Sequence, residues 1–389
     1  MHLFAEATTK FTLELFRQLR ESKDNIFYSP TSIMTALAML QLGAKGNTEQ
    51  QIEKVLQFNE TTKKTTEKTV DCHVSDEKNV HEQFQKLMIQ LNKSNDAYDL
   101  NVSNSIYGAK DFQFLQKFLE NIKEYYQANV ESLDFVHAAE ESQKKINSWV
   151  EKQTNGKIKD LFPAGSLSSS TILVLVNAVY FKGQWNHKFD EKNTTEEKFW
   201  LNENTSKPVQ MMKQKNKFNF NFMEDMQAKI VELPYKGKEL SMFVLLPVEI
   251  EGLKKLEEQL TAEKFLEWTS PEKMHMMDMY LSLPRFKLEE KYDLPRPLEH
   301  MGMLDAFNQQ KADFSGMSSP QGLVVSNILH KSFVEVNEEG TEAAAATGVE
   351  VGVTSVQISE DVNCNHPFLF IIRHNRTKSI LFFGKMSSP

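Results

Sequence analysis

The sequence predicts an α+β fold, because three features call for helices and strands in one chain. Residues 3–20 place their apolar side chains on one helical face. Residues 171–185 form a near-continuous β-branched and aromatic run, typical of a strand covered on both faces. Short alternating segments then follow as far as a carboxyl-terminal hairpin. Helices and strands are therefore both expected to contribute to the core.

Composition narrows the class of protein. The chain has 389 residues, enough for one large domain or two average ones, and 40% of them are hydrophobic, as is usual for a soluble globular protein. Its 45 basic and 53 acidic residues give a formal net charge of -8, so nucleic acid is not an expected partner.

Targeting features and cysteine content predict the compartment. The first ten residues lack a basic start followed by a long apolar core, so no cleavable secretory signal is expected. The apolar stretches fall short of the roughly 18 residues typical of a membrane span, so no membrane association is expected. Cys72 and Cys364 are the only cysteines, which fits a reducing compartment. A cytoplasmic protein is expected, and release without a signal peptide stays open.

Several elements can be placed in chain order. Ser29 suits a helix N-cap and Pro30 suits the first turn of a buried helix that follows. Thr48 is expected to precede another helix. Further helical patterns cover residues 80–91, 115–126, 140–154 and 252–268. Strand patterns cover residues 98–107, 130–135, 207–212, 228–237, 240–247, 280–286, 365–375 and 379–385.

The segment 59–78 is polar, charged and rich in Thr and Lys, with almost no residue that could join a core. It predicts a mobile loop between two helices. Two interpretations stay open, a solvated insertion and a surface for another protein.

The most unusual stretch is 334–355, which follows a strand predicted at 322–335. Residues 337–340 are predicted to form a polar, flexible joint. Beyond it the residues of one parity are uncharged: Thr341, Ala343, Ala345, Thr347, Val349, Val351 and Val353. The other parity holds Glu342 and Glu350. Alternate side chains of a strand point to opposite faces, but four consecutive alanines and two glycines are atypical of strands. The pattern favours a segment that is a loop in one state and a strand in another.

A family resemblance emerges at this stretch. E-E-G-T-E-A-A-A-A-T at 338–347 resembles the proximal hinge of the serpins, although in isolation it also fits a surface linker of small residues. N-I-F-Y-S-P-T-S-I at 25–33, L-G-A-K-G-N-T-E-Q-Q-I at 42–52 and the run 171–185 also resemble serpin segments, in the same order. The resemblance spans essentially the whole chain and is strongest to the ovalbumin-like branch, clade B, near the squamous cell carcinoma antigens.

The resemblance implies a fold and a set of site residues. The fold would be a single serpin domain over 1–389, with about nine helices, three β-sheets and an exposed reactive-centre loop within 338–358. The hinge would comprise Glu339, Gly340, Thr341, Glu342, Ala343, Ala344, Ala345, Ala346 and Thr347. The shutter, where the main sheet parts, would comprise Ser29, Ser32, Asn177 and His330. The breach, where the loop enters the sheet, would include Trp185.

The resemblance also implies inhibition of proteases by a suicide-substrate mechanism. The usual family spacing places the cleaved bond at Thr354–Ser355, with Val353–Thr354 as the alternative, and Val351 and Val353 would occupy substrate subsites. An apolar residue in the second subsite favours papain-like cysteine proteases of the cathepsin L type. Serine proteases of the elastase type are the secondary expectation. A monomer without cofactor or metal is expected.

The sequence also bears on two other functions. An enzyme is not expected, because G-x-S-x-G, a phosphate-binding loop and C-x-x-C pairs are all absent from the sequence. A non-inhibitory serpin that binds or regulates other molecules is the alternative. Such a protein would more often carry bulky or charged hinge residues than the alanines present here.

Overall fold

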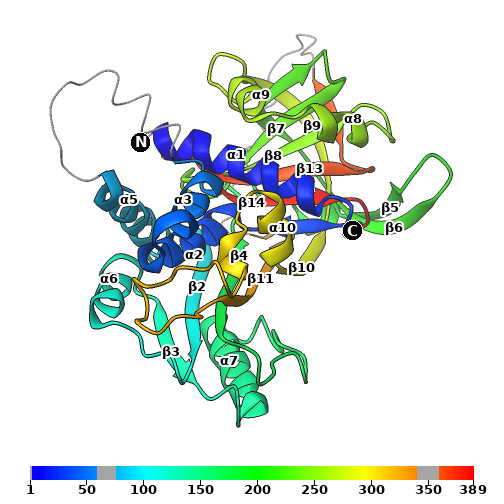
Figure 1. The fold of residues 1–389 in the computed structure, drawn as a ribbon. Coiled ribbons are helices and arrows are strands. Elements are labelled where there is room, and N and C mark those ends of the chain that lie inside the picture. Colours follow the sequence, from blue (N-terminus) through cyan, green and yellow to red (C-terminus); the bar gives the residue numbers. More distant parts are fainter. Residues whose placement is uncertain (1, 59–75, 340–358) are drawn as a thin grey trace, which may run out of the picture.

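The computed structural model describes residues 2–58, 76–339 and 359–389. These ranges contain nine α-helices: α1 (His2–Leu19), α2 (Pro30–Gly43), α3 (Gly46–Val55), α5 (Asp76–Leu91), α6 (Gln116–Tyr126), α7 (Ala139–Gln153), α8 (Leu253–Gln259), α9 (Ala262–Trp268) and α10 (Pro295–His300). They also contain two 3-10 helices, η1 (Glu191–Asn193) and η2 (Asp305–Phe307). Figure 1 shows most of the helices beside or between layers of strands.

The same ranges contain 14 strands in two sheets. The strands are β1 (Ile26–Tyr28), β2 (Tyr98–Ala109), β3 (Asn129–Leu133), β4 (Leu173–Gly183), β5 (Thr195–Trp200), β6 (Ser206–Met223), β7 (Ala228–Pro234), β8 (Leu240–Pro247), β9 (His275–Pro284), β10 (Phe286–Asp293), β11 (Val325–Val336), β12 (Glu360–Asn363), β13 (Phe368–His374) and β14 (Ser379–Met386). The predicted α+β class is therefore confirmed.

The five-stranded sheet has the order β10-β11-β4-β2-β3. Its central pair, β11 and β4, is parallel and is joined from Val325 opposite Leu173 to Val334 opposite Phe181. The outer neighbours β10 and β2 run antiparallel to β11 and β4, respectively. The predicted central strand at 171–185 therefore lies at the centre of this sheet.

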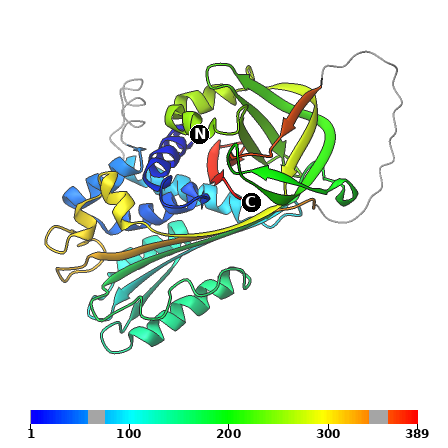
Figure 2. The same cartoon turned by 90° about the vertical axis from the view of Figure 1, so that its right-hand side faces the viewer.

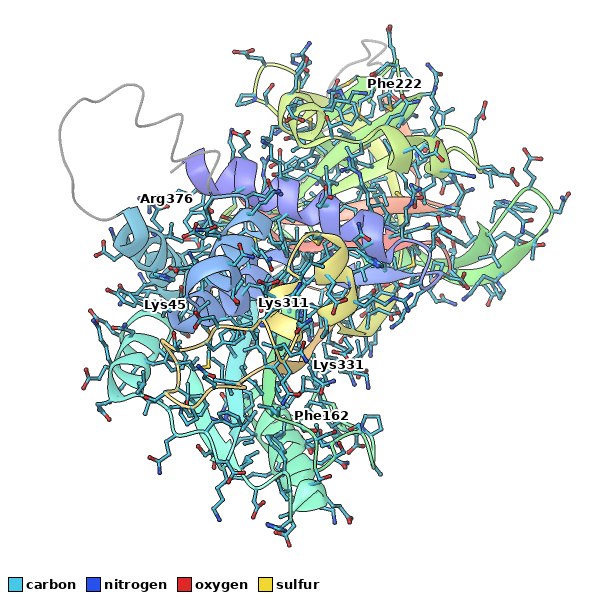
Figure 3. All side chains as sticks on the ribbon, viewed as in Figure 1. Lys45, Phe162, Phe222, Lys311, Lys331 and Arg376 are labelled. Atoms are coloured by element: carbon cyan, nitrogen blue, oxygen red, sulfur yellow. The ribbon has the colours of Figure 1, made fainter. Side chains whose placement is uncertain are left out.

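Both faces of this sheet are covered, which explains the continuous apolar run in β4. Leu173 and Leu175 join the core cluster that includes α2, whereas Val174 and Val176 join the cluster that includes α7. Figure 2 shows the long strands between the amino-terminal helices and α7. Phe162, labelled in Figure 3, is 2% exposed and belongs to the cluster on the α7 side.

The nine-stranded sheet has the order β1-β14-β13-β8-β7-β6-β9-β12, with β5 paired to β6. Strand β6 is 18 residues long and pairs with β5, β7 and β9 over different parts of its length. Asn219 and Phe220 have partners in both β7 and β9. Two of the three expected sheets therefore form one continuous sheet, which is joined through β6.

The strand predicted at 280–286 crosses from the end of β9 at Pro284 to the start of β10 at Phe286. Three predicted helix boundaries were also wrong. Helix α3 begins at Gly46 rather than after Thr48, whose Oγ1 instead accepts a hydrogen bond from the Asp313 N–H at 3.0 Å. The single stretch 252–268 is two helices, because Leu260 is extended and Thr261 caps α9. The predicted loop 59–78 ends earlier, since α5 begins at Asp76. The rest of that loop, 59–75, lies outside the described residues.

Candidate functional site

The buried polar cluster lies where β11, β4 and β2 stand side by side. His330 is the register partner of Asn177, which is in turn the partner of Asn104. Asn177 Nδ2 donates to Asn104 Oδ1 and to Ser32 Oγ, each at 2.5 Å. A hydrogen bond of 2.5 Å also joins His330 Nδ1 to Asn177 Oδ1. The polar groups are paired across the sheet, as a buried amide requires.

The first turn of α2 completes this cluster and determines the protonation of His330. The Ser29 N–H donates to His330 Nε2 at 3.0 Å, and Ser29 Oγ accepts from the Ser32 N–H as the helix N-cap. Because Nε2 accepts, the proton of the neutral ring lies on Nδ1 and is donated to Asn177. Burial lowers the pKa of His330 to about 3. The ring is therefore neutral at pH 7.

The structure thus brings together Ser29, Ser32, Asn177 and His330, the four residues that the resemblance assigned to the shutter. We call these four and Asn104 the shutter cluster. The His330–Asn177 hydrogen bond crosses between β11 and β4, so separating those strands there would break it. Sequence reasoning missed Asn104, because its strand pattern is ordinary and its partner Asn177 is distant in the chain.

Trp185 follows β4 and contacts the residue that follows β11. Its Nε1 donates to the Asn337 carbonyl oxygen at 2.9 Å. Its ring stacks on Tyr235 with centroids 4.6 Å apart and planes at 11°. Trp185 is 4% exposed. This anchors the chain at the point where β11 leads into the predicted hinge.

Glu338, the next residue, is held by an ion pair. It is 4% exposed and forms two hydrogen bonds with Arg285, from Nε to Oε2 at 3.0 Å and from Nη2 to Oε1 at 2.5 Å. Thr194 Oγ1 also donates to Oε1 at 2.6 Å. Burial alone would raise the pKa of Glu338, but the hydrogen bonds from Arg285 and Thr194 outweigh it and hold the pKa below its ordinary value.

Within the predicted joint 337–340, Asn337 and Glu338 thus contact Trp185, Arg285 and Thr194, and the flexibility of the joint stays a prediction. Glu339 differs, because its carboxylate is exposed and lies 3.6 Å from Lys182 Nζ. Its N–H donates to Asn337 Oδ1 at 2.9 Å. Arg285 and Thr194 were not predicted. The only sequence signal was a charged residue at the end of an otherwise alternating strand, M-Y-L-S-L-P-R-F.

The remaining predicted site residues lie outside the described residues. They are Gly340, Thr341, Glu342, Ala343, Ala344, Ala345, Ala346, Thr347, Val351, Val353, Thr354 and Ser355. In the part of the chain that is described, no cluster of three His, Cys, Asp or Glu residues could hold a metal ion. No helix within the same ranges is long and apolar enough to cross a membrane.

Comparison with known proteins identifies the class of this fold. The family model described as Serpin (serine protease inhibitor) matches residues 6–389. Human Serpin B4 is 60% identical and human Serpin B3 is 58% identical, each over 391 residues that cover 100% of both chains. The crystal structure of uncleaved ovalbumin has a TM-score of 0.90 and 38% identity, and the match covers 99% of this chain and 100% of that one.

The chain therefore belongs to the serpin family, whose members are described as serine protease inhibitors. Its similarity to Serpin B4, Serpin B3 and ovalbumin confirms the predicted ovalbumin-like branch, clade B.

Proposed function

We propose that this chain inhibits proteases as a suicide substrate, through cleavage within 338–358 and insertion of the freed hinge between β4 and β11. A protease nucleophile would attack the loop and form an acyl-enzyme, which normally hydrolyses. Insertion would displace the attached protease before water attacks. The observation that carries this proposal is the direct parallel pairing of β4 with β11, the strand that leads into the hinge.

The directions of the strands favour such an insertion. A segment that turns back after β11 runs antiparallel to it, and also antiparallel to β4, because β4 and β11 are parallel. One parallel ladder would be replaced by two antiparallel ladders, which are slightly more stable per residue. Serpin loop insertion is an established example of this kind of strand addition. Residues 341–354 would span roughly 46 Å at about 3.3 Å per residue.

The hinge composition suits burial on one face only. The parity that would face the core carries small or β-branched uncharged residues, beginning with Thr341, Ala343 and Ala345. Glu342 and Glu350 lie on the opposite parity. A charge on the core-facing parity would incur a large desolvation cost.

The loop sequence determines the expected target class. We place the cleaved bond at Thr354–Ser355, with Val353–Thr354 as the alternative. Val353 would then occupy the second subsite and Val351 a more distant one. Papain-like cysteine proteases of the cathepsin L type are the proposed primary targets. Elastase-like serine proteases are the secondary targets, because cleavage after Val353 would suit them.

We propose that the chain acts in the cytoplasm as a monomer and needs no cofactor. Release of the protein from the cell stays open. The alternative is a non-inhibitory serpin that binds or regulates other molecules. The exposed Lys182–Glu339 ion pair and the buried carboxylate of Glu338 are compatible with both functions, so they do not distinguish between them. The hinge alanines favour inhibition.

The test combines a protease panel with two hinge variants. The wild type should form a covalent adduct on denaturing electrophoresis with a cathepsin L-like enzyme, and mass spectrometry should place the cut at Thr354–Ser355. Thr341→Arg puts a cation on the core-facing parity, at a cost of several kcal/mol. Insertion should then slow by about 100-fold or more, so the variant should be cleaved as a substrate.

Glu342→Arg is the matched control, since it places the same cation on the opposite parity and should retain inhibition. Rapid clipping of the wild type without loss of protease activity would contradict the proposal. It would favour the non-inhibitory alternative.

A further inference from the structure

One half of β2 has a neighbour on one side only. Strand β3 pairs with β2 from Ser105 onward, so among the described residues no strand lies beyond the part from Tyr98 to Asn104. Strands of this kind offer unpaired backbone groups to an added strand.

Hydrogen bonds at the other end of β2 show which backbone groups face this open side. The Ala109 N–H donates to the Ile172 carbonyl oxygen, just before β4, whereas the Lys110 N–H donates to Leu133 of β3. Successive residues of a strand point in opposite directions, and the β2–β4 register has no bulge. The N–H and C=O groups of Leu100 and Val102 therefore point to the open side, away from β4.

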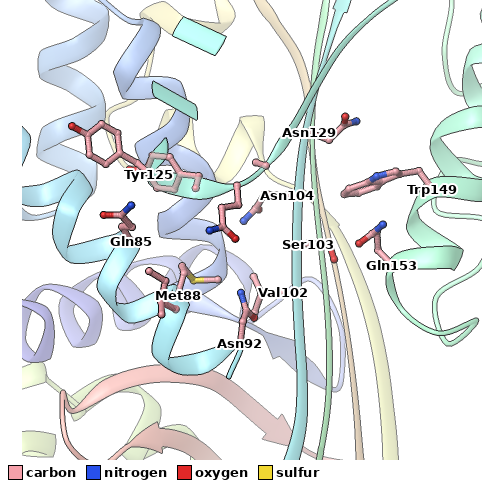
Figure 4. A pocket seen from close by; sticks show the side chains of 14 residues that line it. Gln85, Met88, Asn92, Val102, Ser103, Asn104, Tyr125, Asn129, Trp149 and Gln153 are labelled. Carbon is pink, nitrogen blue, oxygen red and sulfur yellow. The ribbon is translucent and has the colours of Figure 1, made fainter. Parts of the chain in front are cut away.

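A cavity of about 270 Å³ lies at this edge. Figure 4 shows it bounded by Val102 and Ser103 of β2, with Met88 and Tyr125 on one side of the strand and Trp149 on the other. Met88 and Tyr125 belong to α5 and α6, whereas Trp149 belongs to α7. Because residues from both faces of the sheet line the cavity, the space lies in the plane of the sheet. A strand that continued the line of β3 would occupy it.

The lining is uncharged. None of its 14 described residues is Lys, Arg, Asp, Glu or His, and six are carboxamides: Gln85, Asn92, Asn104, Gln127, Asn129 and Gln153. Carboxamides both donate and accept hydrogen bonds, as peptide groups do. The volume of the cavity lies just below the range of ligand pockets, which begins at about 300 Å³. The lining therefore favours a short, neutral stretch of backbone over an ionic or large ligand.

We propose that an uncharged, extended segment of a partner protein adds to the open side of β2 and pairs with Leu100 and Val102. Main-chain hydrogen bonds would provide affinity, as in other cases of strand addition. The segment would lie beside Asn104, which lines the cavity and accepts from Asn177 of the shutter cluster. This surface goes beyond the proposed inhibitory loop, and its test does not use that loop.

The experiment uses an N-acetylated, C-amidated hexapeptide of alternating Thr and Val. At peptide concentrations about ten times Kd, amide exchange of Leu100 and Val102 should slow roughly tenfold, whereas exchange in β4 should not change. Because Asn104 joins the cavity to the cluster, the ring resonances of His330 should also shift. The same peptide N-methylated at every residue should have neither effect, since none of its six residues can then donate a ladder hydrogen bond.

Val102→Pro removes one outward N–H, which an edge strand tolerates, and should abolish binding. Val102→Thr keeps that N–H and should bind as the wild type does. Folding of both variants is checked by circular dichroism. The inference is overturned if both peptides bind equally, if protection appears outside 98–104, or if saturable binding is seen only with a neutral sugar such as maltose.

Discussion

Glu338 is the residue at which the predicted hinge is tied to the body of the protein. The carboxylate is 4% exposed, whereas the side chain of its partner Arg285 is 45% exposed. Removing one partner of a fully buried ion pair costs about 3–5 kcal/mol. The partial exposure of Arg285 lowers this figure. Glu338→Gln should therefore destabilise the protein by about 1–2 kcal/mol, measured as a lower thermal unfolding midpoint at pH 7.

Glu339→Gln is the matched control for that prediction. It removes the neighbouring carboxylate, whose pair with Lys182 has both side chains exposed, by 59% and 43%. Exposed pairs contribute about 0–1 kcal/mol, so this variant should melt close to the wild type. Equal midpoints for Glu338→Gln and Glu339→Gln would show that the Arg285 ion pair does not stabilise the hinge.

The pKa of His330 determines part of the dependence of the protein's stability on pH. The folded ring is neutral because burial lowers its pKa to about 3, whereas in the unfolded chain its pKa is about 6.5. Between these pKa values the unfolded state binds more protons than the folded state does. The contribution of His330 to the free energy of unfolding is therefore complete above pH 6.5 and is lost as the pH falls toward 3. The loss is about 1.4 kcal/mol per pH unit, or about 2 kcal/mol from pH 6.5 to 5.

Chemical unfolding at several pH values should reveal this slope. Other buried histidines, including His81, whose pKa burial lowers to about 4, add to it in the same direction. His330→Asn isolates the contribution of His330 and should reduce the slope by one proton. A slope unchanged by that substitution would be inconsistent with a neutral His330 ring in the folded protein.

At the residue scale, the side chains that the sequence singled out, and that the structure brings together, lie mostly in recognisable segments. Ser29, Ser32 and Asn177 lie in segments that resemble serpin segments, and His330 lies in the strand predicted at 322–335. Hydrogen bonds join these residues in the structure. Arg285 was missed because its partners Thr194 and Glu338 are far away in the sequence, and a single polar residue leaves no periodic signal.

At the element scale, local pattern was enough to predict most helices and strands but not how they pair. The apolar run of β4 indicated a strand covered on both faces. In the structure, α2 packs on one face and α7 on the other. Its parallel pairing with β11 depends on contacts across about 150 residues, which periodicity does not encode. The continuity of the sheet through β6 was hidden for the same reason. The break at Leu260 was missed because both flanking segments are helical.

At the scale of the whole molecule, the described structure and the proposed function together require a more stable state that the intact chain does not reach. Strands β4 and β11 are paired along their length, and a cut within 338–358 would free the hinge to separate them and fill the gap. Several additional kcal/mol of stability would raise the unfolding midpoint by roughly 5 °C or more. We therefore expect the wild type, once clipped by a protease, to melt at least that much higher than the intact protein by calorimetry. Clipped Thr341→Arg should gain far less, because its hinge cannot be buried. If both clipped proteins melt at the temperature of the intact chain, then the paired strands are the end state and the chain does not trap proteases by insertion.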